Sequence, residues 1–161
     1  MKQIPLTQGQ FALVDDEDFE ELSQFKWYAL KTKNTYYACR NFKNIDGNKR
    51  IMLMHRHILK LKDSKIEADH IDNNGLNNQK RNLRECSSAQ NKRNTKSHKD
   101  SFSKYKGVSW HKKDKRWRVR IIINSKCTHI GNFKDEIEAA KKYDEMARIH
   151  HGEFANLNFK D

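Results

Sequence analysis

A long polar stretch in the middle of the chain, residues 68–94, constrains the fold more than any other part. It reads ADHIDNNGLNNQKRNLRECSSAQNKRN, with asparagine recurring throughout and very few apolar side chains. Such a stretch buries too little apolar surface to form a core of its own, so the elements on either side must support it. A run this polar is usually a solvated surface loop.

The polar stretch nevertheless predicts an ordered succession of strand, long loop, strand and helix. Residues 65–71 are short enough for a strand, and residues 72–75 have turn chemistry, because Asn and Gly tolerate positive φ and Asx side chains bond to the local backbone. Leu83 is the apolar anchor of a returning strand. Ser87 and Ser88 are suitable N-caps for a helix.

The residues before this stretch predict a small α+β scaffold that buries one side of it. We expect a strand over residues 3–14 and a helix over residues 16–25. Acidic residues at the start of this helix would interact favourably with the positive end of the helix dipole. The acids at that start are Asp15, Asp16 and Asp18, and the expected core residues after the helix are Trp27, Tyr28 and Leu30. A hairpin follows, with strands over residues 35–42 and 50–54 joined by the Asp46-Gly47 turn. A short helix is expected directly after it, over residues 54–61.

The C-terminal third predicts a second unit of three antiparallel strands and one helix. The strands are expected over residues 106–110, 116–123 and 127–133, and the helix over residues 135–150. The middle strand alternates, with Trp117, Val119 and Ile121 on one face and arginines on the other. We therefore predict an α+β chain with domains at 1–94 and 104–161, joined by a polar linker at 95–103.

The charge distribution indicates a polyanionic partner. The net charge is +12, and the chain is 34% charged and 35% hydrophobic, which favours small cores with much solvated surface. Residues 79–99 carry seven Lys or Arg against one acid, and residues 104–126 carry nine against one. A merely well-solvated surface would mix the signs throughout, so the asymmetry points to nucleic acid.

The chain shows the features of an intracellular protein. It has no apolar run of about 18 residues that would cross a membrane and no apolar signal segment at its start. Its three cysteines lie far apart without a C-x-x-C pair, which favours reduced thiols. A zinc site drawing on Cys39 or Cys86 with His55 and His57 has no supporting ligand spacing. We expect a cytoplasmic protein, from a bacterial or phage-infected cell, without a membrane partner.

The polar stretch carries residue types suited to phosphodiester hydrolysis. Asp69 is a hard oxygen ligand for Mg²⁺ or Mn²⁺, and His70 can accept a proton near neutral pH. Neighbouring residues on a strand point to opposite sides, so a twisted or bulged strand end is needed to bring both to one phosphate. Asn82 would hold the loop or the imidazole, and Asn91 would add a neutral oxygen. The expected phosphate contacts are Arg84, Lys92 and Arg93. His55, upstream, either contacts a phosphate or satisfies a buried hydrogen bond, and we favour the structural role.

The spacing of these residues resembles the ββα-metal fold of the H-N-H nucleases. Asp69-His70, Asn82 within N-L-R and Asn91 within Q-N carry the resemblance. It implies that His70 is the general base, that Asp69 and Asn91 bind one divalent metal, and that Asn82 positions the His70 loop. Many members have a final histidine at the position of Asn91, and homing endonucleases of the family are known with asparagine there.

The C-terminal unit resembles the plant Apetala/ethylene-response-factor DNA-binding domain. Y-K-G-V at 105–108, W-R-V-R-I at 117–121, I-G-N-F at 130–133 and G-E-F-A-N-L-N-F at 152–159 carry the resemblance. In that family the sheet lies in the DNA major groove, where arginine reads guanine. The resemblance implies DNA contacts from Lys106, Arg116, Arg118 and Arg120, with Trp110 and His111 as further candidates.

Together these features favour a site-specific DNA endonuclease of the homing type, encoded by a phage or mobile intron. The sheet would find double-stranded DNA and the H-N-H centre would cut it, with the chain acting as a monomer. The alternative is a non-catalytic, sequence-specific DNA-binding regulator whose nuclease domain has decayed. The basic charge alone would also permit a binder of structured RNA.

Overall fold

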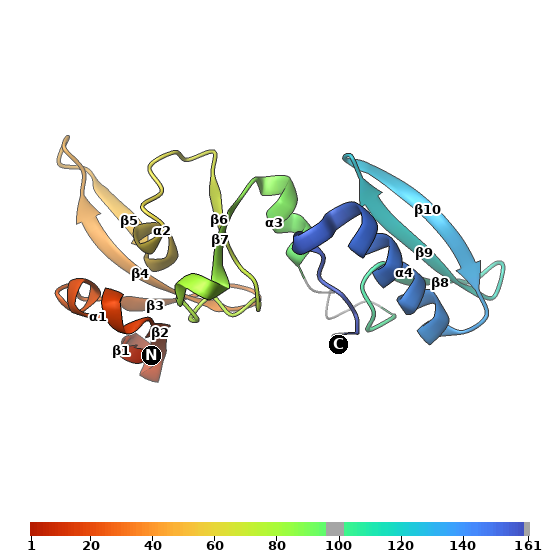
Figure 1. The fold of residues 1–161 in the computed structure, drawn as a ribbon, viewed down its shortest axis with the longest axis horizontal. Helices are drawn as coiled ribbons and strands as arrows, with labels where there is room; N and C mark the ends of the chain where they lie inside the picture. The colour runs from red at the N-terminus through yellow and green to blue at the C-terminus, as the bar shows by residue number, and fades with distance from the viewer. Residues whose placement is uncertain (96–101, 160–161) are drawn as a thin grey trace. The chain divides into compact units, whose positions relative to one another are not determined.

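The chain folds into two compact units, residues Met1–Ser88 and Ala89–Asp161 (Figure 1). The computed structural model describes residues 1–95 and 102–159. Most of the predicted linker, residues 96–101, lies outside the described residues. The mixture of small sheets and four α-helices in the described chain confirms the predicted α+β class. None of the described helices is long and apolar enough to span a bilayer.

The first unit begins with a hairpin where a single strand over residues 3–14 was predicted. Strands β1 (Lys2–Pro5) and β2 (Phe11–Val14) pair antiparallel around the 3₁₀ turn η1 (Thr7–Gly9). Gln8 and Gly9 have φ of 61° and 64°, which reverses the chain. The prediction was wrong because a polar turn of three residues was read as part of the strand.

Helix α1 (Asp16–Ser23) starts as predicted, but Asp15 does not cap it through its side chain. The Asp15 carboxylate instead accepts hydrogen bonds from the Lys80 backbone N–H at 2.8 Å and from Gln79 Nε2 at 3.2 Å. The start of α1 therefore helps to hold the loop that follows His70.

A three-stranded sheet and a short helix complete the scaffold. Strands β3 (Tyr28–Lys31), β4 (Tyr36–Lys43) and β5 (Lys49–Leu53) pair antiparallel in that order, and helix α2 (Met54–Ile58) follows directly. The buried cluster of this unit comprises Ile4, Ala12, Val14, Leu22, Trp27, Ala38, Met54, Ile58 and Leu83. Leu30, predicted in the core, is 37% exposed, because it lies on the sheet face opposite Ala38 and Ala29.

The polar stretch supplies a second hairpin within the same unit. Strands β6 (Glu67–His70) and β7 (Leu83–Cys86) pair antiparallel, with the 3₁₀ turn η2 (Lys80–Asn82) just before β7. The loop between them is attached to β2, since Leu13 receives and donates backbone hydrogen bonds with Asn78 and Leu76, both at 2.8 Å. The polar loop is thus held by backbone pairing to the scaffold, as well as by its own side chains.

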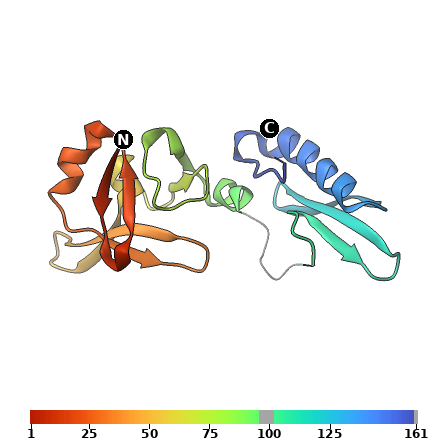
Figure 2. The ribbon, with the colours of Figure 1, turned by 90° about the horizontal axis from the view of Figure 1, so that it is seen from below.

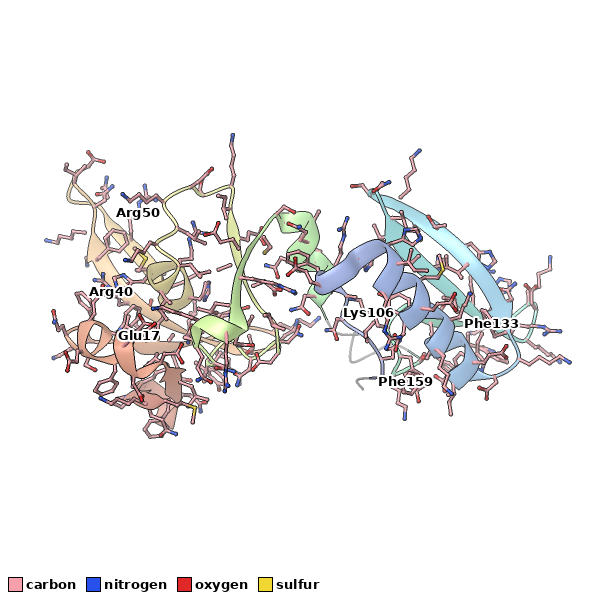
Figure 3. The ribbon with its side chains drawn as sticks, viewed as in Figure 1. Glu17, Arg40, Arg50, Lys106, Phe133 and Phe159 are labelled. Atoms are coloured by element: carbon pink, nitrogen blue, oxygen red, sulfur yellow. The ribbon has the colours of Figure 1, made fainter. Side chains whose placement is uncertain are left out.

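The second unit is a three-stranded sheet covered by one helix (Figure 2). Strands β8 (Val108–His111), β9 (Arg116–Ile123) and β10 (Lys126–Phe133) lie in the order β10-β9-β8, and α4 (Glu136–His151) is followed by η3 (Gly152–Phe154). Val119, Ile121 and Tyr143 are buried between sheet and helix, while Phe133 and Phe159 pack at the edge of this core (Figure 3). Trp110 pairs with Trp117, so it lies on the helix side of the sheet and not on the arginine side.

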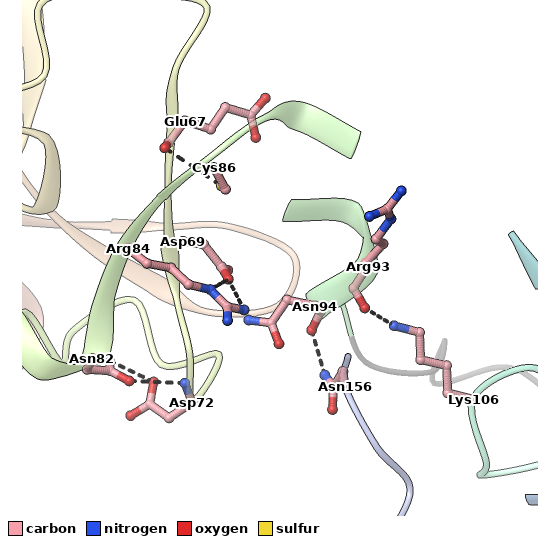
Figure 4. Close-up of polar contacts among 10 residues, drawn as sticks. All are labelled: Glu67, Asp69, Asp72, Asn82, Arg84, Cys86, Arg93, Asn94, Lys106 and Asn156. Atoms are coloured by element: carbon pink, nitrogen blue, oxygen red, sulfur yellow. Dashed lines mark hydrogen bonds and ion pairs between the residues drawn. The ribbon is translucent and has the colours of Figure 1, made fainter. Parts of the chain in front are cut away.

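Helix α3 (Ser88–Asn94) belongs almost wholly to the second unit. Its last carbonyls are satisfied there: Lys106 Nζ donates to the Arg93 carbonyl oxygen, and Asn156 Nδ2 donates to that of Asn94 at 2.5 Å (Figure 4). An ammonium group at a helix C-terminus is favourable because it meets the negative end of the helix dipole. The second unit thus begins at residue 89, earlier than the predicted domain start at 104.

Candidate active site

Asp69 lies at the end of β6 and forms a close ion pair with Arg84 of β7. The two residues are cross-strand partners, and Arg84 donates from Nη2 and Nε to Asp69 Oδ2 at 2.7 and 2.9 Å (Figure 4). Their side chains are only 5% and 12% exposed. Arg84 was predicted as a phosphate contact, and its guanidinium has a carboxylate partner inside the hairpin.

His70 faces the other side of the hairpin, toward the interior of the first unit. It pairs across the ladder with the buried Leu83. The ladder from Glu67 to His70 runs without a register shift, so the bulge that would turn Asp69 and His70 to one side is not present in these strands. The neighbouring side chains therefore flank the strand end from opposite faces.

Asn78, His55 and Tyr37 contact the His70 ring. Asn78 Oδ1 lies 3.3 Å from His70 Nε2. The ring centroids of His55 and Tyr37 lie 4.8 and 5.8 Å from that of His70, and His55 meets it edge to face. The imidazole thus contacts an amide side chain and two aromatic rings that come from different elements.

Asn82 ties down the loop that follows His70. Its Oδ1 accepts from the Asp72 backbone N–H at 3.0 Å, and its Nδ2 donates to Asp72 Oδ1 at 3.0 Å and to the Asn77 carbonyl at 2.8 Å (Figure 4). Its backbone carbonyl also accepts from the Ile71 N–H. Asn82 holds the loop through its backbone and through the Asp72 side chain, and it is Asn78 whose side chain contacts the imidazole.

Burial lowers the pKa of both histidines. Desolvation lowers the pKa of His70, although the Asn78 contact and the nearby Asp72 and Asp69 charges oppose this. Desolvation, together with His70 and Arg56, lowers the pKa of His55 to about 3. The His55 Nδ1 atom is buried without a hydrogen-bond partner, so its role here is packing against His70 and Tyr37.

We predict that the His55 environment makes the fold sensitive to acid. A histidine whose pKa is lowered by folding binds its proton more readily when unfolded, so its contribution to stability declines as pH falls from about 6.5 toward 3. At pH 4 the loss is roughly 3 kcal/mol relative to neutral pH. Urea unfolding of wild type and His55→Phe at pH 7 and pH 4 checks this. The variant should lose less stability than wild type on acidification, and equal losses would contradict the assignment.

The predicted residues after the hairpin lie on α3. Asn91 and Arg93 are half-buried and Lys92 is exposed. Because α3 belongs to the second unit, the geometry of the first unit does not include Asn91. Lys106 is half-buried beside α3, where desolvation lowers the pKa of its ammonium group to about 8. Contacts of Lys92, Arg93 and Lys106 with DNA stay predictions.

The arginines of β9 occupy the sheet face opposite α4. Arg116, Arg118 and Arg120 alternate with Trp117, Val119 and Ile121, and Val119 and Ile121 are buried. Arg118 lies between Ser109 of β8 and Asn132 of β10, and Arg120 pairs with His129. This face therefore presents cations among hydrogen-bonding side chains.

Comparison with known proteins identifies the family. An uncharacterized HNH endonuclease of Acanthamoeba polyphaga mimivirus is 33% identical over 155 residues, which cover 93% of this chain and 75% of the viral protein. The chain belongs to the HNH endonuclease family. Protein 3.8 of Escherichia phage T7 is 36% identical over 89 residues, or 55% of this chain and 73% of the phage protein. No family profile and no solved structure matches.

The two predicted metal ligands of this HNH family member carry oxygen donors of the kind that suit a hard divalent cation. Asp69 offers a carboxylate oxygen, and Asn91 an amide oxygen, both of the type that Mg²⁺ prefers. Within residues 1–95 and 102–159 there is no cluster of three or more His, Cys, Asp or Glu side chains. Metal binding by Asp69 and Asn91 stays a prediction.

Sequence reasoning on this HNH protein missed residues that the fold brings to the site. Asn78 contacts the His70 ring, and Asp72 accepts a hydrogen bond from Asn82. Tyr37 also packs on the His70 ring, from a strand more than thirty positions earlier. The turn chemistry of the asparagine-rich loop predicted that Asx side chains would bond to the local backbone there. It did not distinguish Asn78 from its neighbours, because only the attachment of the loop to β2 decides which asparagine points inward.

Proposed function

We propose that this chain is a metal-dependent, site-specific DNA endonuclease of the homing type, with His70 as general base. The observation that carries the proposal is the β6–β7 hairpin, where Asp69 and His70 end one strand and Asn82 holds the following loop. In an HNH family member, this is the arrangement that the Asp-His, Asn and Asn spacing implies. The β-β-α order of β6, β7 and α3 supports a ββα-metal fold.

The proposed chemistry is hydrolysis of a phosphodiester. His70 takes a proton from water, the water oxygen attacks phosphorus, and the bond from phosphorus to the leaving oxygen breaks. Asp69 and Asn91 would hold Mg²⁺ or Mn²⁺, and the bound ion would stabilise negative charge on the phosphate and the leaving oxygen. Asn82 keeps the loop after His70 in place. The cations expected on the backbone of the DNA are Arg84, Lys92 and Arg93.

Recognition of double-stranded DNA is assigned to the second unit. Its sheet and single helix support an Apetala/ethylene-response-factor type of domain, and a β-sheet face with three arginines suits the major groove. Lys106, Arg116, Arg118 and Arg120 are the proposed contacts. The chain carries one proposed H-N-H centre, and we propose that it acts as a monomer in the cytoplasm of a bacterial or phage-infected cell.

We predict that Arg118→Ala weakens binding to the cognate site by about 1–3 kcal/mol, because an arginine that reads a base contributes that much. The measurement is a titration of labelled cognate and scrambled duplexes at fixed salt. The matched control is Arg148→Ala, an exposed arginine on α4, which should bind like wild type. An equal loss on both duplexes would instead make Arg118 a phosphate contact, and no loss would remove it from the interface.

The proposal is tested by incubating the protein with supercoiled plasmid that carries candidate target DNA. With Mg²⁺ or Mn²⁺ we expect nicked or linear product, and with EDTA none. Binding should also weaken steeply with salt, since counterion release from DNA supplies much of the affinity. Intact plasmid under every metal condition would overturn the proposal.

Two observations favour a second candidate, a DNA-binding regulator without nuclease activity. The His70 residue is only 5% exposed, and the Asp69 carboxylate is engaged by Arg84. A chain of this kind would bind the cognate duplex, lose affinity on Arg118→Ala, and leave the plasmid intact. The cleavage and binding experiments together therefore separate the two functions.

A further inference from the structure

The outer end of the β4–β5 hairpin, residues 43–50, is a basic and exposed part of the first unit (Figure 1). Residues 40–50 carry four Lys or Arg against one acid, Asp46. Lys43, Lys49 and Arg50 are exposed, and within residues 1–95 and 102–159 none of them forms an ion pair with a carboxylate. We call residues 43–50 the basic hairpin end.

Lys43 and Lys49 are direct cross-strand partners at this end. Residues opposite each other in an antiparallel pair have Cα atoms ~4.5–5.5 Å apart, and like charges in such positions weaken the pairing of the strands. The register therefore concentrates positive charge where it opposes the fold. An anion bound by both ammonium groups would offset that repulsion.

The turn that joins the two lysines is fixed by its own hydrogen bonds. The Asn44 N–H donates to the Asn48 carbonyl and the Gly47 N–H to the Asn44 carbonyl, both at 3.0 Å. The Asn44 side chain accepts from the Asn48 N–H at 2.8 Å and donates to Asp46 Oδ2 at 3.2 Å. The single acid of the basic hairpin end is thus bonded to an amide and not to a lysine.

Other cations of the first unit are used inside the fold. The Arg40 guanidinium carbon lies 3.9 Å from the centroid of the Phe25 ring, whereas Arg50, also on the hairpin, is exposed (Figure 3). Lys80 pairs with Glu17 and Asp18 of α1. Residues 1–30 carry six acids against two lysines, and five of these acids lie on α1. A polyanion would therefore be repelled by α1 and attracted to the basic hairpin end.

We propose that the basic hairpin end binds the phosphate backbone of double-stranded DNA through Lys43, Lys49 and Arg50. This inference rests on the proposed function and adds a DNA-binding surface to the unit that carries Asp69 and His70. Each strand of a duplex carries a phosphate every ~3.4 Å of helix axis, so two flexible lysines that start on opposing strands can reach neighbouring phosphates. Phosphate contacts carry no sequence information, so they add affinity without changing the target.

The test compares two double variants with the same change of net charge. Lys43→Gln/Lys49→Gln removes the cross-strand pair, and Lys2→Gln/Lys26→Gln removes exposed lysines that precede and follow the acidic α1 in the chain. Affinity for candidate-target and scrambled duplexes is measured in EDTA over a series of salt concentrations. The hairpin variant should bind both duplexes more weakly by the same factor. Its plot of log affinity against log salt should be shallower by about 2, because each phosphate contact contributes about 0.9 to the slope.

The control variant should keep the slope of wild type. A wild-type slope in Lys43→Gln/Lys49→Gln, or an equal change of slope in the control, would overturn the proposal. Lys43→Glu separates binding from folding, because it replaces the like-charge pair by an opposite-charge pair. Its urea midpoint should equal or exceed that of wild type while its affinity for DNA falls, and wild-type affinity in this variant would also overturn the proposal.

The same measurements distinguish failure of this inference from failure of the proposed function. Binding is measured without metal, so the salt slope decides the hairpin contact whether or not wild type cuts DNA. Cleavage by wild type together with an unchanged slope in the hairpin variant would keep the nuclease and reject the hairpin contact. A wild-type protein that binds neither duplex would overturn both.

Discussion

His70→Ala is expected to lower the rate of DNA cleavage by about 10²- to 10⁴-fold, the usual contribution of a general base. The buried imidazole stands at the end of β6 with its ring held by Asn78, His55 and Tyr37. Alanine removes the proposed proton acceptor and leaves the sheet proposed to bind DNA unchanged. Single-turnover cleavage of a labelled cognate duplex measures the effect, and affinity for the same duplex should stay within about twofold of wild type.

The matched control for His70 is another histidine of the same unit. His57 lies on α2, where its Nε2 contacts Glu21 Oε1 at 2.9 Å and its ring packs on Phe25 and Trp27. His57→Ala should cost some stability and keep cleavage near the wild-type rate. Equal activity of His70→Ala and wild type would remove His70 from the chemistry, and circular dichroism of each variant confirms that the comparison is made on folded protein.

Asp69→Ala is expected to lose both cleavage and stability, for two separate reasons. Cleavage is lost because the proposed metal ligand is gone. Stability falls by about 3 kcal/mol because the substitution removes the carboxylate that is ion-paired with the buried Arg84 guanidinium. Both side chains of the Asp69–Arg84 pair are largely buried, so solvent screens the remaining charge poorly. Chemical denaturation and metal-dependent cleavage measure the two losses.

The double variant Asp69→Ala/Arg84→Met separates these two roles. Replacing the Arg84 guanidinium by an apolar side chain removes the buried positive charge that no longer faces a carboxylate at position 69, so most of the lost stability should return. Cleavage should stay absent, because no carboxylate oxygen is restored. Recovery of both stability and cleavage in the double variant would show that Asp69 serves the fold through Arg84 and is not a ligand.

The fold was predictable from sequence where local signals were strong. Asp46-Gly47 marked a hairpin turn, and the alternation of Trp117, Val119 and Ile121 with arginines predicted the two faces of β9, as the structure has them. The first hairpin was missed because η1 is polar and short, and turns of three residues are easily read as strand. The compact units divide near Ser88, a division that depends on the hydrogen bonds to the C-terminal carbonyls of α3, and the domain bounds of 1–94 and 104–161 stay a prediction.

The candidate site was only partly predictable for a related reason. Spacing along the chain brings Asp69, His70 and Asn82 to one hairpin, and the structure places all three there. Spacing does not reveal cross-strand partners, so the pairing of Asp69 with Arg84 required the register of β6 and β7. It also does not reveal contacts from remote elements, so Tyr37, His55 and Asn78 became visible around His70 only in the folded chain.

A map of cut ends on genomic or intron-flanking DNA, with Mg²⁺ present, tests the central proposal most directly. The expected result is cleavage at one or a few defined sites by wild type, abolished by EDTA and by His70→Ala. Arg118→Ala should reduce cutting at the same sites. Intact DNA with wild type under every metal condition would contradict the nuclease assignment, and cuts spread without sequence preference would contradict the site-specific role of the β8–β10 sheet.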